Sequence, residues 1–183
     1  MTLPAHPLQH WTDALARGAT SSRALTELAL EAATGSSQAS ATFTRVHAER
    51  ARASADAADR VRGAGLPMAP LAGLPISIKD LFDEAGEVTC AGSRVLHDAS
   101  PATSDGAVVR RLRAAGAVIV GRTNMTEFAY SGLGLNPHHG TPLNPWDRAT
   151  GRIPGGSSSG AAVSVSDGMA VAAIGTDTGG SVR

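Results

Sequence analysis

The sequence has few of the features that mark secreted, membrane or nucleic-acid-binding proteins. Its 183 residues include one cysteine, Cys90, so no internal disulfide can form. Basic and acidic residues are equal at 16 each, without a block of like charge, which argues against a nucleic-acid partner. No uncharged apolar run approaches the length that spans a bilayer, and the N-terminal segment lacks the basic and apolar regions of a signal peptide. We therefore predict a cytoplasmic protein without membrane contact.

Aromatic residues and lysine are also scarce. Aromatics make up 3% of the chain, and the small residues Ala, Val and Gly dominate it, so each buried residue contributes less apolar area than Leu or Phe would. Lys79 is the only lysine, and every other basic residue is arginine. A lysine, unlike an arginine, can lose its proton when it is removed from water. The surroundings of Lys79 therefore decide whether this amine takes part in chemistry.

The first 70 residues show a helical pattern. Apolar residues recur at helical spacing, and serines or glycines stand near the expected helix ends. Ser21 and Ser22 are cap candidates for the second helix. The predicted helices lie within residues 8–18, 21–35 and 46–65. We therefore predict that residues 1–70 form an N-terminal helical region.

The remainder of the chain, residues 71–183, alternates between strands and helices. The predicted elements are a β-rich run from Leu74 to Lys79, an amphipathic helix at 104–116, a buried strand at 117–121 and a final strand at 171–177. Ser104 or Asp105 is expected to cap the helix. A helix that leads directly into a strand implies alternating layers, so we predict an α/β fold. The segment before the next helix is rich in Gly, Pro and Asn and is longer than most connecting loops, which favours a functional role.

The stretch TDTGGS follows the last predicted strand and has the composition of an oxyanion hole. Glycine tolerates turns that expose backbone N–H groups, and Ser181 would place its hydroxyl beside the amides of Gly179 and Gly180. Acyl transfer needs such a nucleophile and such donors within one small volume. Taken alone, the stretch is more typical of a glycine-rich turn between a strand and a helix.

A second serine-rich stretch, GGSSSG at residues 155–160, stands at the start of a predicted helix. A helix N-terminus attracts negative charge, and a serine cap is the simpler interpretation. The letters match the G-x-S-x-G elbow of α/β-hydrolases, but no strand is predicted before Ser158 and no histidine follows it. Nucleotide-binding glycine motifs are absent. A serine nucleophile therefore needs a base other than histidine, and a buried, neutral Lys79 is the candidate.

These segments together resemble the amidase signature family. The run PGGSSSGAAVSVSDGMAVAAIGTDTGGSVR is similar to the signature region, and the resemblance extends upstream through LAGLPISIKDLFDEAGEVTCAGS and GRTNMTEFAYSGLGLNPHHGTPLNPWD. It covers residues 71–183. The family fold is a large mixed β-sheet flanked by helices, of which this chain would carry an incomplete, N-terminal part.

The resemblance implies a Ser–cis-Ser–Lys triad. Ser181 would be the acylated nucleophile, and Lys79 would be the base. Ser157 would relay the proton between them, and the peptide bond that joins it to Gly156 would be cis. The backbone amides that would bind the oxyanion are those of Thr178, Gly179, Gly180 and Ser181.

Further residues near these segments have predicted supporting roles. Asp177 and Arg183 flank the glycine turn, and we expect them to form an ion pair that holds it. Met125, Phe128 and Tyr130 are candidates for lining a substrate pocket, although such residues are equally typical of a core. The adjacent His138 and His139 lack further ligands nearby, so we predict no metal site.

The implied function is hydrolysis of a carboxylic amide to an acid and ammonia or an amine, without a cofactor. One alternative is an amidotransferase component that releases ammonia, and another is a non-catalytic fragment that binds anions at its glycine turns. Members of the family are longer than this chain. We therefore expect little or no activity from the chain alone, a small-molecule amide as its substrate, and self-association through an uncovered sheet edge.

Overall fold

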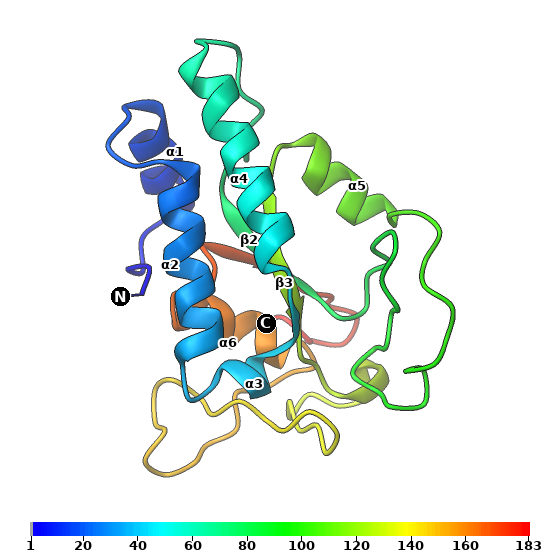
Figure 1. The fold of residues 1–183 in the computed structure, drawn as a ribbon. Coiled ribbons are helices and arrows are strands. Elements are labelled where there is room, and N and C mark those ends of the chain that lie inside the picture. Colours follow the sequence, from blue (N-terminus) through cyan, green and yellow to red (C-terminus); the bar gives the residue numbers. More distant parts are fainter. Residues whose placement is uncertain (1) are drawn as a thin grey trace.

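The fold is a mixed β-sheet with flanking helices, seen in a computed structural model that describes residues 2–183 (Figure 1). The helices are α1 (Leu8–Ala16), α2 (Ser22–Gly35), α3 (Ala39–Thr42), α4 (Ala48–Gly63), α5 (Ala107–Ala114), the 3₁₀ helix η1 (Glu127–Ala129) and α6 (Ser159–Ser166). The strands are β1 (Phe43–Val46), β2 (Pro75–Lys79), β3 (Val118–Thr123) and β4 (Ala172–Ile174). The α/β class predicted from the sequence is confirmed.

The sheet has the strand order β1-β3-β2-β4. The central strand β2 runs parallel to both β3 and β4, and β1 lies antiparallel to β3 at one edge. Every residue of β2 and β3 is buried, as is typical of parallel strands that are covered on both faces. Lys79 is the last residue of β2, so it lies at the carboxyl end of a central strand.

The alternation of side chains along β2 assigns them to the two faces of the sheet. The Ser77 hydroxyl lies 2.9 Å from the hydroxyl of Ser164 in α6, so Ser77 and Lys79 face α6. Ile76 and Ile78 face the opposite layer, where α2 and α4 pack side by side (Figure 1). One cluster of buried apolar residues includes side chains from both helices and from the sheet, which ties the N-terminal helices to the same core.

The N-terminal region, predicted as helical, also contains the strand β1, which the sequence analysis did not predict. Phe43 pairs with Thr123 and Val46 pairs with Gly121 across the antiparallel ladder. Glycine is needed at position 121, because a Cβ there would lie 2.4 Å from a backbone oxygen of β1. A four-residue strand shows little periodicity of its own, and its partner lies far away in the sequence. Tertiary pairing therefore decides its conformation.

The start of α5 also differs from the prediction. The helix begins at Ala107, and no side chain caps it, so neither Ser104 nor Asp105 has the predicted role. The Asp105 carboxylate instead accepts hydrogen bonds from the Ala85 backbone at 2.8 Å and from Arg113 at 2.9 Å. The Ser21 cap of α2 is confirmed, since its hydroxyl accepts the N–H of Ala24 at 3.0 Å. In the described part of the chain, no helix combines the length and the hydrophobicity that crossing a membrane requires.

Candidate active site

The side chain of Lys79 ends among three hydroxyl groups. Its ammonium nitrogen lies 2.7 Å from Ser157 Oγ, 3.0 Å from Ser158 Oγ and 2.7 Å from Thr176 Oγ1. The residue is fully buried. Burial lowers the pKa of Lys79 to about 8, although the carboxylate of Asp177 acts in the opposite direction. A neutral amine is therefore accessible to this lysine near physiological pH.

Close packing at the start of α6 brings the serines to Lys79. A Cβ on Gly160, in the first turn of α6, would lie 2.3 Å from the carbonyl oxygen of Thr42 and 2.7 Å from the backbone nitrogen of Asn124. Only glycine lets the helix approach the end of β3 this closely. The peptide bond between Gly156 and Ser157 is cis, as the resemblance implies. The glycines of the GGSSSG stretch thus allow the backbone geometry that directs Ser157 toward Lys79.

The third hydroxyl near Lys79 belongs to Thr176, which follows the strand β4. This strand covers three residues rather than the predicted 171–177, and the chain then leaves the sheet. Ile78 of β2 lies opposite Ile174 of β4, so the residues that follow the two parallel strands meet at one edge of the sheet. Thr176 therefore reaches Lys79 from the neighbouring strand.

Ser181 lies at the same site, but its hydroxyl is not engaged. Its carbonyl oxygen accepts the N–H of Ser158 at 3.2 Å. Within residues 2–183, the Ser181 hydroxyl has no hydrogen-bond partner, so the expected contact with Ser157 is not formed. Ser181 lines a hollow of about 390 Å³ together with Tyr130, Gly156 and the turn at 178–180. The structure therefore brings the three predicted catalytic residues into one region and directly joins two of them, Lys79 and Ser157.

Asp177 holds the turn that carries Ser181. Its carboxylate accepts the backbone N–H groups of Gly180 at 2.7 Å, Val182 at 3.3 Å and Arg183 at 3.2 Å. The Arg183 guanidinium donates two further hydrogen bonds at 2.9 and 3.0 Å, so the expected ion pair is present. The hydrogen bond from Arg183, reinforced by those from the backbone, keeps the pKa of Asp177 well below its usual range. The turn is thus built around an ionised carboxylate.

The predicted set of oxyanion donors needs one correction. The N–H of Gly180 is directed at Asp177, so it is not available to a substrate in this conformation. The amides of Thr178, Gly179 and Ser181 have no hydrogen-bond acceptor among residues 2–183. Gly180 has a φ of 112°, a conformation that favours glycine. Its role here is to shape the turn.

The three pocket candidates differ in position. Tyr130 is 93% exposed and lines the hollow beside Ser181. Phe128 is half exposed and lies outside the lining residues, and Met125 is fully buried in the interior. Met125 therefore belongs to the packing of the protein rather than to the hollow.

Sequence reasoning missed two of the hydroxyls around Lys79. Ser158 was expected only to start a helix, and Thr176 had no predicted role, yet both contact the lysine nitrogen. One signal was available for Thr176, namely a hydroxyl residue near the carboxyl end of a strand that is parallel to the strand ending in Lys79. That signal becomes readable only when the two strands are known to be neighbours.

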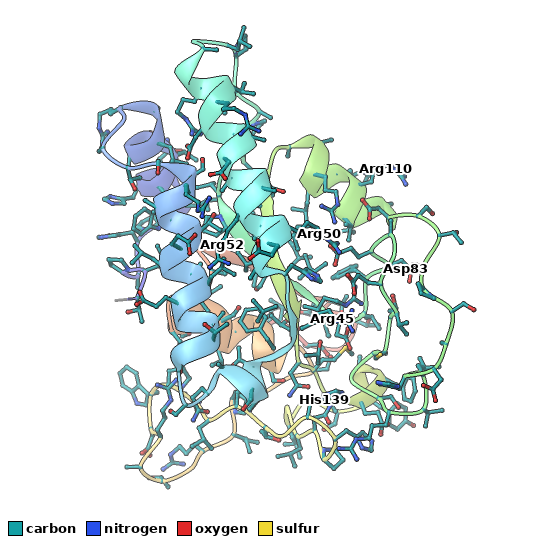
Figure 2. All side chains as sticks on the ribbon, in the orientation of Figure 1. Arg45, Arg50, Arg52, Asp83, Arg110 and His139 are labelled. Atoms are coloured by element: carbon teal, nitrogen blue, oxygen red, sulfur yellow. The ribbon has the colours of Figure 1, made fainter. Side chains whose placement is uncertain are left out.

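A buried acidic residue, Glu84, anchors the segment that follows β2. Its carboxylate contacts His47 at 2.8 Å, Arg50 at 2.7 Å and Arg113 at 2.6 Å. Arg45 and Arg50 extend toward this segment from β1 and α4 (Figure 2). Burial alone would raise the pKa of Glu84, but the hydrogen bond to His47 and the charges of His47, Arg50 and Arg113 lower it to about 2. This cluster connects α4 and α5 to the segment that follows β2, and it does not line the hollow.

The chain is similar to subunits of a hydrolase and of an amidotransferase and to a peptide amidase. A model of the amidase family, described as Amidase, matches residues 24–183. AtzE, which is one subunit of the 1-carboxybiuret hydrolase of Pseudomonas sp. (strain ADP), is 44% identical over 171 residues, which are 93% of this chain and 37% of that protein. One subunit of the glutamyl-tRNA(Gln) amidotransferase of Cupriavidus necator is 48% identical over 179 residues, 96% of this chain and 34% of that protein.

A solved structure supports the same comparison. The native peptide amidase from Stenotrophomonas maltophilia has a TM-score of 0.78 and 34% sequence identity, covering 91% of this chain and 35% of its own. The chain thus spans between 34% and 37% of the length of these three relatives.

Proposed function

The chain belongs to the amidase signature family, and from this premise we propose that it carries the catalytic serines and lysine of an enzyme that hydrolyses carboxylic amides. The products are a carboxylic acid and ammonia or an amine. The observation that carries the proposal is the buried contact of 2.7 Å between Lys79 Nζ and Ser157 Oγ. A fully buried lysine with a lowered pKa in contact with a serine hydroxyl, next to a hollow lined by Gly156, Thr176 and Ser181, suits general-base chemistry.

The proposed reaction begins with proton transfer through the serines. Neutral Lys79 accepts the proton of Ser157, which accepts the proton of Ser181, and the Ser181 oxygen attacks the amide carbonyl. The free amides of the turn at 178–181 bind the oxyanion of the tetrahedral intermediate. The relayed proton passes to the leaving nitrogen, and water then hydrolyses the acyl-enzyme. The first transfer requires the Ser181 hydroxyl to move into contact with Ser157.

A second candidate function is release of ammonia within a larger assembly. The 48% identity to a component of an amidotransferase favours it, and the chemistry at Ser181 is the same. In both cases the substrate is a small-molecule amide. We also propose that β4, an edge strand without a second neighbour in the sheet, mediates association with another protein chain. We further propose that the protein acts in the cytoplasm, in keeping with its unpaired Cys90.

A fluorophosphonate probe tests the nucleophile and its base directly. Phosphonylation needs only an activated serine, so it is informative even where turnover of an amide by the chain alone is low. We expect mass spectrometry to find the label on Ser181, and we expect Ser181→Ala and Lys79→Ala to abolish it. Ser166→Ala is the matched control, because Ser166 is an exposed serine at the end of α6.

Two results would count against the proposal. Labelling that persists in Lys79→Ala would remove the base from the mechanism. Absence of labelling, combined with saturable binding of inorganic phosphate, would favour the alternative of a non-catalytic anion-binding fragment.

A further inference from the structure

We propose that Thr176 is a positioning residue for the base: its hydroxyl accepts one N–H of neutral Lys79, so that the lone pair of the amine faces Ser157. This inference rests on the proposed function, because it concerns how Lys79 becomes able to take a proton. It assigns a role to a residue that the triad does not contain.

The charged form of Lys79 is fully satisfied where it stands. An ammonium group has three N–H donors and no acceptor, and three hydroxyl oxygens lie within 3.0 Å of the nitrogen. A neutral amine has two N–H donors and one lone pair. After deprotonation, one of the three hydroxyls must therefore donate to the nitrogen while the other two accept. The base can receive the proton of Ser157 only if Ser157 is the donor.

Ser158 must be one of the two acceptors. Its hydroxyl donates to the carbonyl oxygen of Thr176 at 3.3 Å, so its proton is already engaged. Its oxygen also lies 3.4 Å from the backbone nitrogen of Thr176, a long contact that holds it against the same residue. Ser158 therefore accepts an N–H of Lys79 in either protonation state.

The choice between Ser157 and Thr176 follows from burial. Ser157 is fully buried, and among residues 2–183 its hydroxyl has Lys79 as its only hydrogen-bond partner. Thr176 is half-buried and lines the hollow, where its proton can reach water or a substrate. If Thr176 donated to the amine, the buried Ser157 proton would lose its acceptor, which is costly. If Ser157 donates and Thr176 accepts, every buried donor is satisfied.

The charged groups near Lys79 do not change this assignment. Asp177 is the carboxylate that acts on the amine, and it is paired with Arg183. From the neighbouring strand β3, Arg122 is paired with Asp80 at 2.8 Å. The helix α6, SGAAVSVS, contains no ionisable side chain. The hydroxyls therefore decide the orientation of the amine.

The scarcity of lysine makes the proposal directly measurable. Lys79 is the only lysine, so protein labelled with ¹⁵N-lysine and carrying a lysine-free tag gives one side-chain signal, whose pH titration reports its pKa. Thr176→Val removes an acceptor from the ammonium, which donates stronger hydrogen bonds than the neutral amine. We expect the pKa of Lys79 to fall by about one unit in Thr176→Val and to return to the wild-type value in Thr176→Ser.

A matched control separates this effect from a general change in the core. Thr123 is fully buried, lies opposite Lys79 in the sheet, and donates its hydroxyl to the Ile78 carbonyl at 3.3 Å instead of contacting the amine. We expect Thr123→Val to leave the pKa of Lys79 unchanged. We also expect Thr176→Val to slow phosphonylation of Ser181 at least tenfold at the alkaline plateau, and Thr176→Ser to retain most of the wild-type rate.

The outcomes distinguish this inference from the proposed function. An unchanged or raised pKa in Thr176→Val overturns the assignment of Thr176 as an acceptor, even when the wild type is phosphonylated normally. Conversely, a wild type that is not phosphonylated overturns the proposed function, while the titration still shows which hydroxyls hold the amine.

Discussion

The rate of Ser181 phosphonylation is expected to follow the fraction of Lys79 that is neutral. With the pKa of Lys79 lowered to about 8 by burial, about one tenth of the molecules carry the free amine at pH 7 and about nine tenths at pH 9. The rate should therefore rise about tenfold between these values and level off above pH 9. The measurement is the initial rate of fluorophosphonate labelling at a fixed probe concentration, in steps of half a pH unit, with the modified peptide quantified by mass spectrometry.

The direction of the profile follows from the sign of the shift. A lysine whose pKa is lowered loses its proton at a lower pH than an exposed lysine, so the base becomes active within the physiological range. A lysine in water would give a midpoint of about 10.4 instead. A profile that is flat from pH 6.5 to pH 9.5, or one with its midpoint above pH 10, would refute the reasoning that burial generates the base. Heat-denatured protein provides the correction for intrinsic reactivity of the probe.

Three further substitutions test the surroundings of the site. Asp177→Asn should slow labelling about tenfold by loosening the nucleophile turn, and should move the midpoint of the pH profile to lower pH, because the carboxylate raises the pKa of Lys79. Glu84→Gln should lower the free energy of unfolding at pH 7 by about 3 kcal/mol in urea denaturation. The contribution of Glu84 is present above its ordinary pKa and is lost as the pH falls through about 2. The difference between wild type and variant should therefore be less than half as large at pH 3 as at pH 7, and a difference that does not change with pH would contradict this reasoning. Gly160→Ala should lower the free energy of unfolding by about 3 kcal/mol or prevent folding, because the added Cβ would lie 2.3 Å from a backbone oxygen. The control is Gly63→Ala, where the added Cβ would have no atom within 4 Å. This control should leave the free energy of unfolding unchanged or slightly raised.

Much of the fold could be read from local pattern. The helices α2 and α4, the run that ends at Lys79 and the helix-to-strand step into β3 have strong periodicity or clear end signals, and all are present. The strand β1 was missed, because four residues carry too weak a pattern to compete with the helices around them. The cap of α5 was misassigned because Asp105 bonds Ala85 and Arg113 instead, which local pattern cannot reveal.

The candidate site divides in the same way. Several features of the site could be identified from the sequence alone: the single lysine, the two glycine-serine stretches and the Asp177–Arg183 pair. Each is a local feature, because a glycine turn or an isolated charged residue is defined by a few neighbouring residues. The fully buried position of Met125 and the engagement of the Gly180 amide were not recognisable. Both depend on which groups happen to surround the residue in space.

The sequence by itself determined which chemical groups are available: one amine able to lose its proton, a set of serine hydroxyls and a glycine turn that exposes backbone amides. Only the tertiary structure decided how these groups are combined. Lys79 and Thr176 are 97 positions apart and meet because β2 and β4 are parallel neighbours, so that their carboxyl ends open at the same edge of the sheet. Strand order depends on burial summed over the whole core, and a local pattern of residues carries no record of it.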